Sequence, residues 1–403
     1  MKRITPFFFV LFLYLQVYTQ NNQNWTTDLD TLQYYLLQKD YLFVNMSKNK
    51  FKKSILKLKK NFNNNEELNY WNLDKLLNKF KISNLEISLD NFVRFPFEIK
   101  QFQDKYYITS INLKNEKLLG FQLLKINNHT LTNIINDKEI NNINIKSFLE
   151  FNKITSNNNI ALEVLSDDNK KQIINLTIDN NVDIVNLKPK TKAFYLQKKN
   201  RWYWQYGINF GQQVYFKFNV GLSKEFIDNT MDSLAISEIT ISKQYKIPLQ
   251  TIYDAPSFDD FTDKLFLKFK KRRYKKLFID FRNMKSANDL IIDKFISKLK
   301  KSRINKRGRL FLFVDESVSS TVIKMIEKLK SKTKASIIGE TIKGCDCNTN
   351  KVLSFYLPNT RYKIYYPIRN FKTIVITPKI PVIYTFSQYI NGIDPIMQAI
   401  LNN

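Results

Sequence analysis

The chain has 403 residues, of which 43% are hydrophobic and 14% aromatic, enough to build a substantial core, so the composition excludes an intrinsically disordered chain. The length predicts two or three domains. Lysine and arginine outnumber aspartate and glutamate by 64 to 36, a formal net charge of +28, but the lysines are dispersed among abundant asparagines and no RNA- or DNA-binding motif accompanies them, so we expect no nucleic-acid partner.

The N-terminal residues have the order of a secretory signal peptide. Lys2 and Arg3 precede an apolar stretch over residues 7–15, and polar residues follow from Gln20. The apolar stretch is too short for a membrane-spanning helix; the alternative is an ordinary buried segment. We predict that residues 1–19 are removed, that no transmembrane span remains, and that the mature protein is secreted or periplasmic.

Residues 20–90 predict a helical region. Apolar residues recur at intervals of three, four and seven, and asparagine-rich breaks separate the groups. The groups are Leu29, Leu32 and Leu36, then Phe51, Ile55 and Leu58, then Leu73, Leu76, Leu77 and Phe80.

Residues 91–187 predict a β-rich module, because the apolar spacing changes to short alternating runs. The expected strands cover residues 106–108, 121–126, 160–164 and 173–178.

From residue 188 to the C-terminus, predicted strands alternate with helical segments, which is typical of an α/β core.

One junction between a predicted strand and a predicted helix contains a candidate nucleophile. A buried strand over residues 310–314 runs into a serine-rich turn, and a helix follows from Ser320. A hydroxyl at such an elbow can be exposed, and a helix N-terminus supports developing negative charge. The alternative is that Ser319 or Ser320 only caps the helix.

Five sequence blocks resemble successive blocks of the tail-specific (C-terminal processing) serine peptidases, and the last resembles the closing signature of their secreted bacterial members. The blocks lie at residues 305–310, 315–320, 338–341, 357–359 and 378–395. Their order and spacing carry the resemblance, since no single block is decisive.

The resemblance implies an α/β fold (α+β overall) with a helical N-terminal region, a PDZ-like β module and a ClpP/crotonase-like α/β peptidase core over residues 188–403. Residues 120–127 resemble a strand and turn of a PDZ-like module, in which an exposed sheet edge can accept a peptide as an added strand. The implied activity is a serine-type endopeptidase that acts on peptides or unfolded proteins, with Ser320 as nucleophile and neither metal nor cofactor.

A serine nucleophile needs a base within hydrogen-bond reach. The tail-specific branch supplies a lysine from a Gly-Glu-x-Thr-x-Gly-Lys-Gly pattern, and here Cys345 stands at the lysine position. Lys343, two residues earlier, is the candidate base if the loop is shortened; the alternative is a solvated loop lysine. The tricorn-type branch uses a Gly-His-Thr histidine, and its position falls near Asn84. His129, the single histidine, is predicted to be a surface turn residue.

The family's oxyanion loop begins Asp-x-Arg and continues to glycines whose backbone amides approach the substrate carbonyl. Asp280 and Arg282 are present, but no glycine follows through Asn288. We interpret this pair as structural, and the amides of Thr321 and Lys285 as the candidate oxyanion donors.

Cys345 and Cys347 are the only cysteines and are predicted to be loop residues, with any bridge between them strained.

Three hypotheses follow. The chain is an extracytoplasmic serine endopeptidase, a pseudopeptidase that binds peptides or protein C-termini without cleaving them, or a cationic surface protein that binds envelope polyanions. A base within reach of Ser320 separates the first two hypotheses. The third requires a continuous basic face rather than dispersed lysines.

Overall fold

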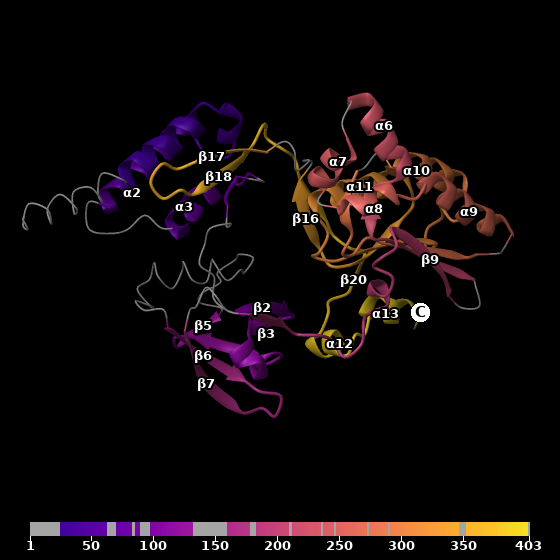
Figure 1. Cartoon of the computed structure of the whole chain (residues 1–403), viewed down its shortest axis with the longest axis horizontal. Helices are drawn as coiled ribbons and strands as arrows, with labels where there is room; N and C mark the ends of the chain where they lie inside the picture. Colours follow the sequence, from indigo (N-terminus) through magenta and orange to yellow (C-terminus); the bar gives the residue numbers. More distant parts are fainter. Residues whose placement is uncertain are drawn as a thin grey trace, which may run out of the picture. The chain divides into compact units, whose positions relative to one another are not determined.

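The computed structural model describes residues 25–62, 70–82, 85–88, 97–131, 159–177, 183–208, 212–234, 237–245, 247–271, 274–288, 291–345 and 352–401. The predicted signal peptide and Asn84 lie outside these ranges. The chain divides into two compact units, one made of Met1–Leu187 and Lys351–Asn370, the other of Lys188–Asn350 and Phe371–Asn403 (Figure 1). A segment of the predicted C-terminal core thus belongs to the first unit.

The first unit contains the expected helices. They are a helix over residues 25–37, η1 (Asp40–Phe43), α2 (Lys48–Phe62), α3 (Tyr70–Leu77) and η2 (Asn78–Phe80). They pack on a three-stranded antiparallel sheet with the order β1 (Glu86–Ile87), β18 (Lys363–Pro367), β17 (Val352–Tyr356). The hairpin β17–β18 lies beside α2 and α3 in Figure 1 and completes their hydrophobic core with Phe355 and Ile364.

The hairpin is also fixed by polar contacts. The carboxylate of Asp28, fully buried on the first helix, accepts hydrogen bonds from the backbone N–H groups of Asn359 and Thr360, both at 2.8 Å. The block at residues 357–359 therefore has a structural role in this unit.

The β-rich module has its own core. Its elements are β2 (Phe97–Phe102), β3 (Lys105–Asn112), η3 (Leu113–Leu118), β4 (Gln122–Ile126), β5 (His129–Thr130), β6 (Asn159–Leu165), β7 (Lys171–Thr177) and β8 (Ile184–Asn186). The main path of the antiparallel sheet is β2-β3-β4-β6-β7. Alternation in β6 buries Ile160, Leu162 and Val164 on one face, as the sequence pattern predicts.

The second unit is built on a six-stranded sheet with the order β20 (Ile380–Pro381), β15 (Ser336–Gly339), β14 (Leu310–Val314), β12 (Lys276–Asp280), β10 (Gln213–Phe218), β9 (Tyr203–Ile208). Neighbours from β20 to β10 are parallel, and β9 is antiparallel to β10. Both faces are covered, so the strands are almost continuously apolar. This is the α/β architecture that the sequence predicts.

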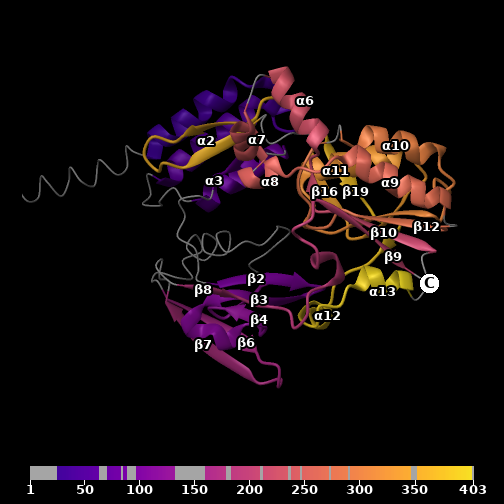
Figure 2. The same cartoon turned by 45° about the vertical axis from the view of Figure 1, so that its right-hand side comes forward.

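Helices cover both faces of this sheet, with α9, α10 and α11 on one side and α13 on the other (Figures 1 and 2). The helices are η4 (Phe194–Leu196), α6 (Lys224–Leu234), α7 (Glu238–Tyr245), α8 (Leu249–Tyr253), α9 (Phe258–Lys271), α10 (Ile292–Lys301), α11 (Ser320–Lys332), α12 (Phe386–Ile390) and α13 (Pro395–Leu401). Within the ranges that the structure describes, no helix is long and apolar enough to cross a membrane.

Two short strand pairs lie against α11. One joins β11 (Val220–Gly221) to β13 (Lys285–Ala287), and the other joins β16 (Ile342–Cys345) to β19 (Thr373–Ile376). Because α11 begins at Ser320, these pairs gather the segments that contain the candidate site residues.

Candidate active site

The strand–turn–helix elbow is present. β14 ends at Val314 and α11 begins at Ser320, with Ser319 as its N-cap. The Ser319 side chain makes no capping hydrogen bond and lies 3.0 Å from the Thr321 hydroxyl instead. Ser319 therefore occupies the N-cap position, as the alternative interpretation has it, but its side chain does not supply a capping hydrogen bond.

The Ser320 hydroxyl faces the backbone of β16. It is half-buried, and its Oγ accepts a hydrogen bond from the N–H of Cys345 at 3.3 Å. A Cβ on Gly344 would lie 3.0 Å from this Oγ and 2.6 Å from Cδ1 of Ile323, so the absence of a side chain permits the close approach of strand and helix. Across the described residues, Ser320 has no hydrogen bond to a Lys, His, Asp or Glu side chain.

Lys343, the candidate base, is exposed. Successive side chains of a strand point to opposite faces, and the position of a Gly344 side chain would meet Ser320, so Lys343 projects from the other face of β16. The structure therefore brings the strand of Lys343 to Ser320 but directs its side chain away. His129 is exposed in β5 of the first unit.

The candidate oxyanion donors lie on elements that pack together. Thr321 belongs to the first turn of α11, and Lys285 begins β13, which packs against α11. The backbone N–H of Asn283, two residues before Lys285, donates to the Ser317 hydroxyl at 2.7 Å. The turn before α11 is thus tied to the loop that carries Lys285.

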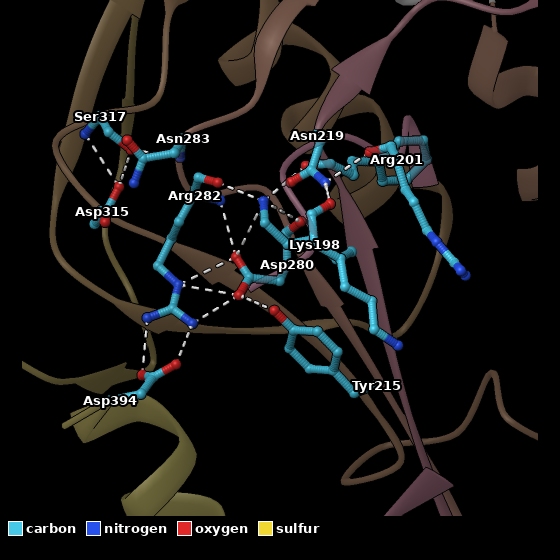
Figure 3. A network of polar contacts seen from close by, with 12 residues as sticks. Lys198, Arg201, Tyr215, Asn219, Asp280, Arg282, Asn283, Asp315, Ser317 and Asp394 are labelled. Carbon is cyan, nitrogen blue, oxygen red and sulfur yellow. Dashed lines mark hydrogen bonds and ion pairs between the residues drawn. The ribbon is translucent and has the colours of Figure 1, made fainter. Parts of the chain in front are cut away.

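Asp280 and Arg282 form a buried ionic network with Asp394 (Figure 3). Arg282 is fully buried, donates from Nη2 to Asp280 at 2.6 Å, and binds both oxygens of Asp394 at 2.9 and 2.7 Å. Tyr215 donates to Asp280 at 2.6 Å. Burial would raise the pKa of Asp280, but mainly the charge of Arg282 holds it below the ordinary value. The structural interpretation of this pair is confirmed.

Lys217 extends the network at the carboxyl end of β10. Its fully buried ammonium donates to the carbonyl oxygens of Phe218 at 2.7 Å, Arg282, and Asp280 at 3.4 Å. Burial lowers the pKa of Lys217 to about 8, against the attraction of Asp280. Lys217 therefore joins the end of β10 to the backbone of the Asp-x-Arg segment.

A third carboxylate stabilises the turn before α11. Asp315 accepts hydrogen bonds from the N–H of Ser317 at 3.1 Å and from its hydroxyl (Figure 3). Burial raises the pKa of Asp315. Because the Ser317 hydroxyl also accepts from Asn283, both its donor and acceptor functions serve the turn.

Sequence reasoning missed the roles of Lys217, Asp394 and Ser317. A signal for Lys217 was available, because a lysine inside the apolar run Val-Tyr-Phe-Lys-Phe of a predicted buried strand must have partners. Asp394 lies 112 residues from Arg282, and no local pattern reports such a pair.

The described residues include no group of three or more His, Cys, Asp or Glu side chains placed to hold a metal ion. Cys345 is disulfide-bonded, and the one other cysteine, Cys347, lies outside the described ranges. The cysteine in the lysine position of the family pattern is thus not a free thiol.

Comparisons with known proteins fix the fold. No family model and no curated protein matches the sequence. Mature CPAF complexed with lactacystin is 10% identical, with 93% of this chain and 96% of that chain covered at a TM-score of 0.54. A CPAF mutant is 9% identical, with 93% and 95% covered at a TM-score of 0.53. At such identity the likeness establishes the fold alone. This chain therefore has the fold of CPAF, which is that of the tail-specific proteases, as its sequence blocks predict.

Proposed function

We propose that this protein is an extracytoplasmic pseudopeptidase, which binds peptides or unfolded protein segments on a serine-peptidase fold and hydrolyses them very slowly or not at all. The observation that carries the proposal is the environment of Ser320, whose Oγ accepts a hydrogen bond from the backbone of Cys345 and has no bond to an ionisable side chain in the described residues.

The lack of a base and the composition of the oxyanion segment support this proposal. A serine hydroxyl without a base is a poor nucleophile, and Lys343 projects from the face of β16 away from it. The oxyanion segment has no glycine, and loss of one oxyanion donor alone costs roughly 100- to 1,000-fold in rate. The buried network of Arg282 and Lys217 meanwhile preserves the scaffold around the elbow.

Peptide binding rests on the β-rich module. The main path of its antiparallel sheet ends at β7, most of whose residues are exposed, and an exposed edge strand can pair with an added peptide strand. A peptide or unfolded protein is therefore the proposed partner. The proposal that the protein is exported rests on the signal-peptide pattern of its N-terminus, in which basic residues, an apolar stretch and polar residues follow one another.

The second candidate is an active serine-type endopeptidase with Ser320 as nucleophile. The position of Ser320 at the N-terminus of α11, beside β13 with Lys285, favours it. Its base would come from outside the described residues or from another chain.

Hydrolysis of fluorescein-labelled casein, together with labelling by a fluorophosphonate that reacts with activated serines, separates the candidates. We expect no turnover above that of Ser320→Ala and no labelling. Any weak turnover should be lost in Ser320→Ala and unchanged in the control His129→Ala, and Lys343→Ala should lower it only if Lys343 is the base. Robust turnover that Ser320→Ala abolishes would establish the peptidase instead.

Binding is measured separately with fluorescent unstructured peptides by anisotropy. The pseudopeptidase predicts saturable binding that Ser320→Ala leaves unchanged. Absence of both binding and hydrolysis would refute both candidates. Mass spectrometry of the exported protein checks the location, since an intact Met1 in a cytosolic protein would contradict export.

A further inference from the structure

The helix α2 holds a row of lysines toward solvent. They recur at intervals of three or four residues, which places them on one face of the helix, and each is exposed. They are Lys50, Lys53, Lys57 and Lys60. Phe51 and Ile55, on the other side of α2, are fully buried in the core of the first unit. This packing fixes the direction of the lysine row.

Two further lysines lie on α3 and η2, which pack in the same hydrophobic core as α2. Lys75 on α3 and Lys79 on η2 are both exposed. Partial burial, and then the charge of Lys75, lowers the pKa of Lys79. Lys57 and Lys50 act on Lys79 in the same direction, so the two groups of lysines lie within electrostatic reach of one another. We call these six residues the basic face.

The basic face is not a simple result of a lysine-rich composition. Two other lysines of α2 are paired, Lys48 with Asp40 and Lys59 with Asp30. The six lysines of the basic face form no ion pair with any residue of the described ranges. The positive charges of these six lysines are therefore not balanced by ion pairs within the described residues, and they repel one another.

We propose that the basic face docks the protein on an anionic lipid bilayer, by contacts of its ammonium groups with the phosphates of the headgroups. Leu56 favours a bilayer over other polyanions. It is 56% exposed and lies three residues after Lys53 and four before Lys60, so it shares their face. A leucine among lysines suits the bilayer interface, where the apolar side chain enters the headgroup region.

The expected strength follows from the number of charges. Each lysine near an anionic leaflet raises partitioning about fivefold, the equivalent of about 1 kcal/mol. Loss of the four lysines of α2 should therefore reduce partitioning by roughly 100-fold or more. The attraction is electrostatic, so salt should weaken it.

Co-sedimentation of the full mature chain with vesicles tests the proposal. The vesicles contain equimolar phosphatidylcholine and phosphatidylglycerol, or phosphatidylcholine alone. The test variant carries Lys→Gln at Lys50, Lys53, Lys57 and Lys60. The control variant carries Lys→Gln at four exposed lysines spread over the second unit, which changes the net charge equally. These are Lys224, Lys243, Lys306 and Lys372.

We expect binding to the anionic vesicles alone, a loss of roughly 100-fold in the test variant, and little change in the control. Circular dichroism and thermal unfolding check that the test variant is folded. Equal loss in both variants would assign the binding to net charge and overturn the proposal. So would binding to uncharged vesicles, or retention of an oligonucleotide through the same lysines without binding to lipid. Ser320→Ala should bind the vesicles normally, so this result stands apart from that of the peptide assay.

Discussion

Removal of the Asp394 carboxylate should destabilise the second unit strongly. Arg282 is fully buried and pairs with both Asp280 and Asp394. Asp394→Ala removes the carboxylate that accepts hydrogen bonds from both Nη1 and Nη2 of the guanidinium. Removing one partner of a buried ion pair typically costs about 3–5 kcal/mol, because the remaining charge is desolvated and unpaired. For a unit of this size that corresponds to a fall in Tm of roughly 6–20 °C.

Thermal unfolding followed by circular dichroism, with urea unfolding for the free energy, measures the effect. The matched control is Asp263→Ala, because Asp263 pairs with Lys298 on the surface at 2.5 Å and its side chain is 61% exposed. Exposed pairs contribute about 0–1 kcal/mol, so this variant should unfold close to the parent.

Two further variants sharpen the test. Asp394→Asn keeps the shape of the side chain and one acceptor oxygen, so we expect a loss of stability between that of the parent and that of Asp394→Ala. Arg282→Leu removes the partner of two buried carboxylates, and we expect the largest loss. If Asp394→Ala lowers Tm no more than Asp263→Ala does, the network is not a stabilising element and the reasoning fails.

Three other variants test separate parts of the fold. Burial lowers the pKa of Lys217 to about 8, from an ordinary value of 10.5. Between pH 8 and pH 10.5 the unfolded chain therefore binds more protons than the folded protein, and the free energy of unfolding should rise by up to about 1.4 kcal/mol per pH unit. Urea unfolding at a series of pH values should show that Lys217→Met loses this rise, and an unchanged profile would contradict the assignment. Gly339→Ala should cost more than about 3 kcal/mol, because φ is +130° and the new Cβ would lie 1.9 Å from the Val314 oxygen; a Tm within a few degrees of the parent would show that the turn can relax. Asp28→Ala should cost about 2–3 kcal/mol in the first unit, since the Asn359 amide loses a charged acceptor, and unchanged unfolding in urea would refute that role.

The sequence alone determined those features that depend on neighbouring residues. Alternation in Ile160–Val164 predicted a strand that the structure contains, because side-chain direction in a strand has a period of two. The continuous apolar run Leu310–Val314 predicted a strand that is covered on both faces, which the structure also contains. The helix that begins at Ser320 was also predicted from local sequence, because apolar residues recur with a period of about 3.6 after a serine-rich turn. The order of the family blocks then predicted the peptidase fold.

Tertiary structure alone decided what these elements bring together. The hairpin at residues 352–367 belongs to the helical unit, because its apolar side chains complete a core formed far earlier in the chain. The environment of Ser320 depends on the pairing of β16 with β19 and its packing on α11, which turns Gly344 toward the hydroxyl and Lys343 away from it. Local sequence fixes that neighbouring strand residues face opposite ways, but packing against distant elements fixes which of the two faces the serine.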